Sequence, residues 1–226
     1  MRFVTNLILL VCLGANTAFL VAAEDTLYFD DGVTVRVLWF EPDTQQAPPP
    51  LAVLMTGGSN NEFMARAQFW MGKELVNRGW AIAVPISNQG RKFFVENSGL
   101  LPQVIKRIRE NHAVTEDKAL LVGISSGGSA ALAIAAQTPD NYRGVIAAPG
   151  RLWEEDNIAQ LDGLPIFLRV GAKDDFRWHR KLEHQAQILK NSGAVVNAAL
   201  VADAHHIFPL DWSEVEAWLQ TLPQPD

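Results

Sequence analysis

The stretch LLVGISSGGSAALAIA, residues 120–135, joins an apolar run to an alanine-rich segment through glycines and serines. Within it Gly123, Ser125 and Gly127 form the pattern G-x-S-x-G, which is typical of a tight turn between a strand and a helix. Side chains two residues before and after the serine would collide with this turn, so glycines are required there. The helix would begin behind Ser125, with the Ser126 amide aimed at any developing negative charge. The stretch therefore predicts a displayed serine nucleophile, the alternative being a glycine-rich loop without chemistry.

Short apolar runs alternate with helical segments along the rest of the chain. The runs are apolar on both faces, as in strands buried in a parallel sheet, and cover residues 51–56, 80–85, 119–124, 144–149, 165–170 and 197–202. Helical spacing is found at residues 64–78, 99–111, 127–137, 176–191 and 212–221. Earlier runs at 26–29 and 33–40 flank a turn signal and predict a hairpin. This order predicts an α/β fold with a mostly parallel central sheet flanked by helices, whose ligands gather beyond the carboxyl ends of the strands.

Composition limits the protein to one globular domain behind a targeting segment. Of its 226 residues, 48% are hydrophobic and 19% are charged, and the net charge of −6 argues against nucleic acid as the main partner. Residues 1–23 combine Arg2, an apolar run and small residues, as a secretory signal peptide does. We expect cleavage after Ala23, one domain over 24–226, secreted or periplasmic localisation and no stable membrane span; an uncleaved anchor is the alternative. The single cysteine, Cys12, lies in the leader, so the mature chain offers no thiol nucleophile.

A serine nucleophile needs a base, and the segment VADAHHIFP, residues 201–209, supplies the candidates. His205 and His206 follow the last strand-like run and precede the last helix. The other histidines lie in or at the end of helical segments, where solvated or capping roles are expected. His206 is the preferred base and His205 the alternative. No histidine spacing typical of a metal site accompanies the pair, so no metal or cofactor is predicted.

The orienting acid and the oxyanion donors are expected at two further strand ends. Asp174 and Asp175 directly follow the run that ends at residue 170. If Asp175 caps the helix that starts near residue 176, Asp174 is left to orient the histidine; the reverse assignment stays open. The segment LMTGGSNNE, residues 54–62, follows the first central strand, and its glycines let backbone amides approach a substrate oxygen. We expect the amide of Gly58 or Ser59 there, together with that of Ser126, the alternative being a plain glycine turn.

Taken in chain order, these motifs resemble the α/β-hydrolase superfamily. Glycine loop, G-x-S-x-G turn, aspartate and histidine follow one another as in its members, and the resemblance covers roughly residues 26–222. Within the superfamily the chain is most similar to small, lid-poor esterases of the dienelactone-hydrolase, phospholipase/carboxylesterase and polyhydroxybutyrate-depolymerase-like groups. GAKDD, residues 171–175, resembles their acid loop, and HHIFP, residues 205–209, their G-H-x-W/F-P segment. The chain departs from the pattern at His205, where glycine is usual, and at Thr56, where many members carry histidine.

The resemblance implies an α/β-hydrolase fold without a full cap domain, since only residues 150–164 separate two successive strand-like runs. It also implies a carboxylic ester hydrolase that acts on short or exposed acyl esters through a Ser-His-Asp triad and a covalent acyl-enzyme. A small-molecule ester is therefore the expected partner. The alternatives are a serine peptidase of the prolyl-oligopeptidase type and a secreted, non-catalytic binding protein with the hydrolase fold.

Overall fold

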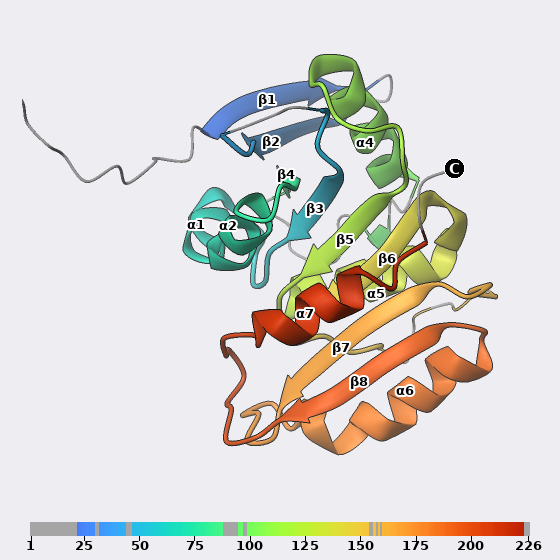
Figure 1. Ribbon diagram of the computed structural model, residues 1–226. Helices are drawn as coiled ribbons and strands as arrows, with labels where there is room; N and C mark the ends of the chain where they lie inside the picture. The colour runs from blue at the N-terminus through green and yellow to red at the C-terminus, as the bar shows by residue number, and fades with distance from the viewer. Residues whose placement is uncertain are drawn as a thin grey trace, which may run out of the picture.

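The computed structural model describes residues 22–29, 32–43, 47–87, 95–96, 99–153, 156, 158 and 160–223. Within them one eight-stranded sheet has the order β1-β2-β4-β3-β5-β6-β7-β8 (Figure 1). β2 pairs antiparallel with β1 and β4, and the strands from β4 to β8 pair in parallel. The strands are β1 (Ala22–Tyr28), β2 (Thr34–Phe40), β3 (Leu51–Met55), β4 (Ala81–Ile86), β5 (Ala119–Gly123), β6 (Tyr142–Ala147), β7 (Pro165–Gly171) and β8 (Val195–Val201).

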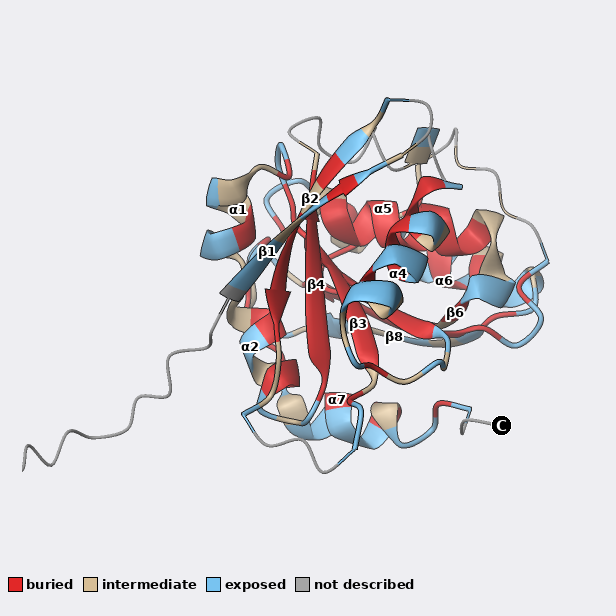
Figure 2. Ribbon diagram, turned by 90° about the horizontal axis from the view of Figure 1, so that it is seen from above, coloured by how far each residue is buried: buried red, intermediate tan, exposed pale blue. Residues whose placement is uncertain are grey.

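The helices cover both faces of this sheet. The α-helices are α1 (Glu62–Ala67), α2 (Trp70–Val76), α4 (Leu100–Asn111), α5 (Ser126–Gln137), α6 (Leu182–Asn191) and α7 (Trp212–Leu219), and the 3₁₀-helices are η1 (Pro139–Asn141) and η2 (Trp178–Lys181). Residues of α4, α5 and α6 share one apolar core with the sheet, and residues of α1, α2 and α7 share a second core on its other face. Figure 2 shows the buried central strands, with exposed residues on α1, α2, α4 and α7, whereas α5 is almost entirely buried. The predicted α/β class, mostly parallel sheet and N-terminal hairpin are confirmed.

Burial explains which strand predictions were accurate. Every residue of β3, β4, β5 and β7 is buried, because helices pack on both faces of these central strands. The last run was also expected to be buried on both faces, and that expectation is wrong. β8 is the edge strand beyond β7, and its residues Val195 and Leu200 are 64% and 50% exposed.

Two predicted helices differ from the structure. The segment expected as one helix over residues 64–78 forms α1 and α2, which are interrupted at Gln68 and Phe69. The segment over 176–191 becomes helical only at Trp178, because Arg177 has a φ of 62°, in the left-handed region. η2 then leads directly into α6. Asp175 therefore caps no helix starting near residue 176, contrary to expectation.

The N-terminal hairpin is anchored to the central sheet and to α4. β2 pairs with β4, and the α4 C-cap residue His112 has its Nε2 atom 2.7 Å from an Asp25 carboxylate oxygen. The His112 ring stacks on Trp39 with 4.1 Å between ring centroids. The predicted leader, residues 1–23, lies outside the described residues except for Ala22 and Ala23. Among the described helices, none combines the length and the apolar character needed to cross a membrane.

Candidate active site

Ser125 stands in a strained turn between β5 and α5. Its φ of 57° and ψ of −122° lie outside the regions that L-residues usually adopt, at a cost of about 1–3 kcal/mol. Close packing on both sides makes the flanking glycines necessary. A Cβ atom at Gly123 would lie 2.4 Å from the Gly127 carbonyl oxygen, and one at Gly127 would lie 2.0 Å from the Met55 carbonyl oxygen. A side chain at Gly123 or Gly127 would therefore prevent this turn.

Ser125, His206 and Asp174 form a continuous hydrogen-bonded chain. Ser125 Oγ lies 2.8 Å from His206 Nε2, and His206 Nδ1 lies 2.6 Å from Asp174 Oδ2. Because an ionised carboxylate only accepts, Nδ1 carries the proton and Nε2 is left to accept from the serine hydroxyl. The other carboxylate oxygen of Asp174, Oδ1, accepts the backbone N–H of Trp178 at 3.1 Å. The Asp174 side chain is fully buried and that of His206 is 11% exposed, so the pair is shielded from water.

The neighbouring histidine and aspartate form a separate, exposed pair. His205 Nδ1 lies 3.2 Å from Asp175 Oδ1, and the two side chains are 65% and 61% exposed. The hydrogen bond with His205 holds the pKa of Asp175 below its usual value. Neither residue contacts Ser125. The hydrogen-bonded arrangement of a serine hydroxyl, an imidazole and a buried carboxylate therefore uses His206 and Asp174.

The loop after β8 reaches the end of β7 through a close backbone approach. The Lys173 N–H donates to the Ala204 carbonyl at 2.8 Å, which ties the acid loop to the histidine loop. A Cβ atom at Gly171 would lie only 2.0 Å from the His205 carbonyl oxygen. Gly171 is therefore required for His206 to reach Asp174. The glycine of GAKDD is the signal in the sequence that corresponds to this contact.

Two aromatic rings pack edge-on against the His206 imidazole. The Phe176 ring lies 4.5 Å from it and the Trp178 ring 4.9 Å, measured between centroids. Trp178 is buried, whereas Phe176 is 66% exposed and stands on the solvent side of the histidine. The two rings restrict rotation of the His206 imidazole.

The glycine loop after β3 lies directly beside Ser125. A Cβ atom at Gly57 would lie 3.0 Å from the Ser125 Cβ atom, and the Ser126 hydroxyl donates to the Gly58 carbonyl at 3.3 Å. Gly58 has a φ of 63°, which favours glycine. Among the described residues, the amides of Gly58, Ser59 and Ser126 donate no hydrogen bond within the protein. These three N–H groups therefore have no acceptor among the described residues.

Side-chain hydrogen bonds that the sequence did not reveal hold the glycine loop after β3 in place. The Gly57 N–H donates to the Gln68 side-chain oxygen at 2.6 Å, so this amide is already occupied. The Thr56 hydroxyl donates to the buried Asn60 side-chain oxygen at 2.6 Å, and the Asn60 side-chain N–H donates to the Pro85 carbonyl at 3.2 Å. These contacts link the loop to α1 and β4. Thr56, which departs from the family pattern, therefore contributes to loop geometry through its side chain.

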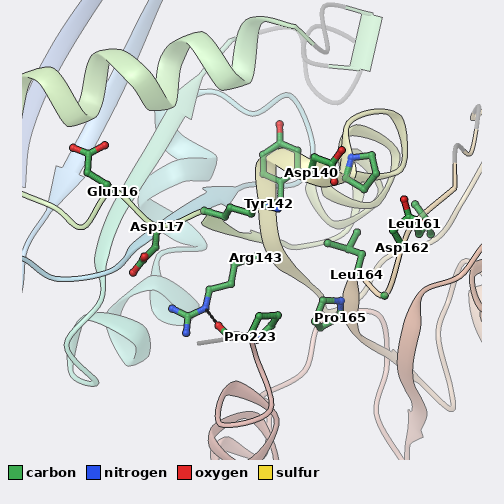
Figure 3. Close-up of a pocket in the computed structure, with 13 residues that line it drawn as sticks. Glu116, Asp117, Asp140, Tyr142, Arg143, Leu161, Asp162, Leu164, Pro165 and Pro223 are labelled. Atoms are coloured by element: carbon green, nitrogen blue, oxygen red, sulfur yellow. Dashed lines mark hydrogen bonds between the residues drawn. The ribbon is translucent and has the colours of Figure 1, made fainter. Parts of the chain in front are cut away.

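A cavity of about 500 Å³ lies elsewhere, at the amino ends of the parallel strands (Figure 3). Tyr142 at the start of β6 and Pro165 at the start of β7 line it, together with acidic side chains such as Asp140 and Asp162. None of its lining residues belongs to the Ser125 site. No three histidine, cysteine or acidic side chains of the described residues are grouped as metal ligands would be.

A family model described as "Putative esterase" matches residues 87–225 of the chain. No curated protein matches the chain. Among solved structures, the "Putative Dienelactone Hydrolase" of Klebsiella pneumoniae subsp. pneumoniae MGH 78578 is 16% identical, with a TM-score of 0.71 over 90% of this chain and 99% of that chain. The acetyl xylan esterase of Aspergillus awamori is 11% identical, with a TM-score of 0.69 over 88% and 99%.

Larger proteins contain the same fold as one part. A thermostable esterase is 14% identical, with a TM-score of 0.65, and the chain spans 55% of its length. The "putative dipeptidyl aminopeptidase IV" of Bacteroides ovatus ATCC 8483 is 11% identical, with a TM-score of 0.73, and the chain spans 36% of its length. At these identities the likeness shows the fold alone, which is the α/β-hydrolase fold.

Proposed function

Because the chain belongs to the "Putative esterase" family and is a hydrolase acting on ester bonds, we propose that it is a serine carboxylic ester hydrolase. In this proposal Ser125 is the nucleophile, His206 the general base and Asp174 the acid that orients it. The observation that carries the assignment is the unbroken hydrogen-bonded chain from Ser125 Oγ through the imidazole to the buried carboxylate. That chain supplies both requirements of an activated serine, a base and a group that fixes its tautomer.

The first step forms an acyl-enzyme. Ser125 Oγ attacks the ester carbonyl carbon while His206 Nε2 takes the hydroxyl proton, and Asp174 stabilises the resulting imidazolium. The carbonyl oxygen becomes an oxyanion, which accepts hydrogen bonds from the Ser126 amide and from that of Gly58 or Ser59. The bond to the alcohol oxygen then breaks, and His206 returns the proton to that oxygen as the alcohol leaves.

The second step releases the acyl group and uses the same side chains and backbone amides. Water attacks the acyl carbonyl carbon and gives a proton to His206 Nε2. The tetrahedral intermediate collapses by breaking its bond to Ser125 Oγ, which takes the proton back, and the carboxylic acid leaves. The same amides hold the oxyanion in both steps, since the carbonyl oxygen stays in one place. No group besides those of the protein and water is required.

We infer that the substrates carry short or exposed acyl groups. Among the described residues between β6 and β7 there is no helix, and Phe176 beside the base is largely exposed. An open site of this kind contacts little of a long acyl chain, so it offers such chains little binding energy.

The decisive test is the Ser125→Ala variant of the purified protein. Hydrolysis of 4-nitrophenyl acetate should fall by about a million-fold, with unchanged circular dichroism. A fluorophosphonate probe should label Ser125 in the wild type and nothing in the variant. Unchanged hydrolysis in the folded variant would overturn the assignment, and an unlabelled wild type would favour the binding-protein alternative. A serine peptidase is not favoured, because the resemblance to the aminopeptidase concerns the fold alone.

We also propose that the protein is exported and that residues 1–23 are removed. The support is the sequence of the leader, with Arg2 before an apolar run and small residues before Glu24. Expression of the full chain in a secreting bacterial host, followed by N-terminal sequencing of the extracytoplasmic product, tests this. Glu24 should be the first residue, and retention of the leader in the membrane fraction would contradict the proposal.

A further inference from the structure

Arg151 lies against the segment that carries Ser125. After β6 the chain turns back along the start of α5, where the Ser125 N–H donates to the Pro149 carbonyl at 2.8 Å. Two residues later, the Arg151 N–H donates to the Ser129 hydroxyl at 3.2 Å. The backbone of Arg151 is therefore fixed to the same helix that displays the nucleophile.

The guanidinium group of Arg151 contacts two tryptophan rings, one of which also contacts the base. Its Cζ atom lies 3.9 Å from the centroid of the Trp153 ring and 5.6 Å from that of Trp178. The Trp178 ring lies 4.9 Å from the imidazole of His206. One indole thus separates a positive charge from the catalytic histidine. Stacking on aromatic faces orients the planar guanidinium and lowers its hydration, which prepares it to bind an anion.

In the described part of the chain this guanidinium has no anionic partner. The Arg151 side chain forms no ion pair or hydrogen bond with another described residue, and its Nε atom is buried without an acceptor. Arg169, which is buried, shows the contrast. Its side chain donates to Glu214 and to the carbonyls of Leu168 and Asn197. The Nε atom of Arg109 is also buried without an acceptor, but Arg109 still donates through Nη2 to the Asp117 carbonyl. The Arg151 side chain has no acceptor among the described residues, and a ligand would supply one.

We propose that Arg151 binds a carboxylate carried by the ester substrate. This rests on the proposed ester hydrolysis at Ser125 and names the substrate class as carboxylate-bearing esters. A carboxylate matches the guanidinium, because its two oxygens accept two parallel N–H bonds. The carboxylate can belong to the acyl part or to the alcohol part of the ester. Arg151 is then a residue that determines specificity, while bond cleavage remains with Ser125, His206 and Asp174.

Matched pairs of esters separate charge from size. For the acyl side the pair is mono-4-nitrophenyl glutarate and its methyl ester; for the alcohol side it is 4-acetoxybenzoate and its methyl ester. The wild type should hydrolyse the anionic member of one pair with a kcat/KM at least about tenfold above that of the neutral member. In Arg151→Gln the ratio of kcat/KM for the anionic ester to kcat/KM for the neutral ester should fall toward one, chiefly because KM for the anionic ester rises. Arg151→Lys should keep part of the preference for the anionic ester, because a lysine retains the positive charge but lacks the paired N–H donors of the guanidinium.

Arg180→Gln is the matched control, since it removes an exposed arginine of η2 near the same loop. For both ester pairs, the anionic-to-neutral ratio of kcat/KM in this variant should equal that of the wild type. A wild type that does not discriminate within either pair would overturn the proposal. So would an Arg151→Gln variant that loses equal activity toward charged and neutral esters, because that outcome assigns Arg151 a structural role.

Calorimetry keeps this proposal separate from the proposed hydrolysis. Glutarate or 4-hydroxybenzoate should bind the wild type and Arg180→Gln, and should bind Arg151→Gln at least about tenfold more weakly. This result does not require turnover. Failure of the proposed function would appear instead as absent hydrolysis of 4-nitrophenyl acetate and absent fluorophosphonate labelling. If neither carboxylate binds the wild type, the inference about Arg151 is wrong even where neutral esters are hydrolysed.

Discussion

The imidazole of His206 faces the carboxylate of Asp174, with 2.6 Å between Nδ1 and Oδ2 and with the carboxylate fully buried. The residue before His206 and the residue after Asp174 make the same kind of contact at the surface, where His205 pairs with Asp175. Each exposed residue is therefore a matched control for its buried neighbour. The same substitution, made one position apart, separates a catalytic role from a general effect on the loop.

Replacing His206 with alanine should reduce kcat for 4-nitrophenyl acetate by about 10⁶-fold, because Ser125 then has no base. The measurement is steady-state hydrolysis corrected for the uncatalysed rate. His205→Ala should retain activity within a few-fold of the wild type. Strong loss in His205→Ala, with activity kept in His206→Ala, would identify the other histidine as the base.

Asp174→Asn should lower kcat by about 10⁴-fold, since an amide no longer selects the tautomer that leaves Nε2 free to accept. Asp175→Asn should leave kcat close to that of the wild type. Asp175 is exposed and its pKa is already below the usual value, so it stays ionised in the neutral range without affecting the base. Equal losses in the two variants would contradict the assignment of Asp174 as the orienting acid.

Burial raises the pKa of Tyr142 to about 12, against about 10 in the unfolded chain. A raised folded-state pKa stabilises the protein at pH below the unfolded value, and this stabilisation is lost between about pH 10 and 12. The chain has two tyrosines, so in Tyr28→Phe the phenolate absorbance reports Tyr142 alone. We expect its titration near pH 12, and we expect Tyr142→Phe to lack that part of the alkaline loss of stability. A midpoint near pH 10 in the folded protein would contradict the prediction.

The sequence predicts the strand ends that meet at this edge, because glycines, aspartates and histidines directly follow long apolar runs. It leaves His205 and His206 as alternatives, since the choice depends on which side chain meets the buried Asp174 carboxylate, and the sequence does not mark this contact between separate loops. Gln68 and Arg151 escape notice for the same reason. Their partners are the Gly57 amide and the Trp178 ring, and no local pattern marks contacts between such separated residues.

Gln68 is expected to act as a positioning residue for the oxyanion donors. Its side-chain oxygen holds the Gly57 N–H at 2.6 Å, and Gly58 with its unoccupied amide comes next in the chain. In Gln68→Ala the loop loses this acceptor, and kcat for 4-nitrophenyl acetate should fall by roughly 10- to 100-fold with little change in KM. Fluorophosphonate labelling of Ser125 should slow by a similar factor, because that reaction also develops charge on an oxygen.

Gln68→Glu distinguishes positioning from general destabilisation of the loop. A glutamate keeps an acceptor for the Gly57 N–H, so kcat should recover to within a few-fold of the wild type even though the side chain has gained a charge. Gln187→Ala, which removes an exposed glutamine of α6 whose side chain donates to Asn191, should leave kcat and KM unchanged. If Gln68→Ala and Gln68→Glu lose the same activity and unfold at the same lowered temperature, then Gln68 supports the fold of the loop rather than the geometry of its amides.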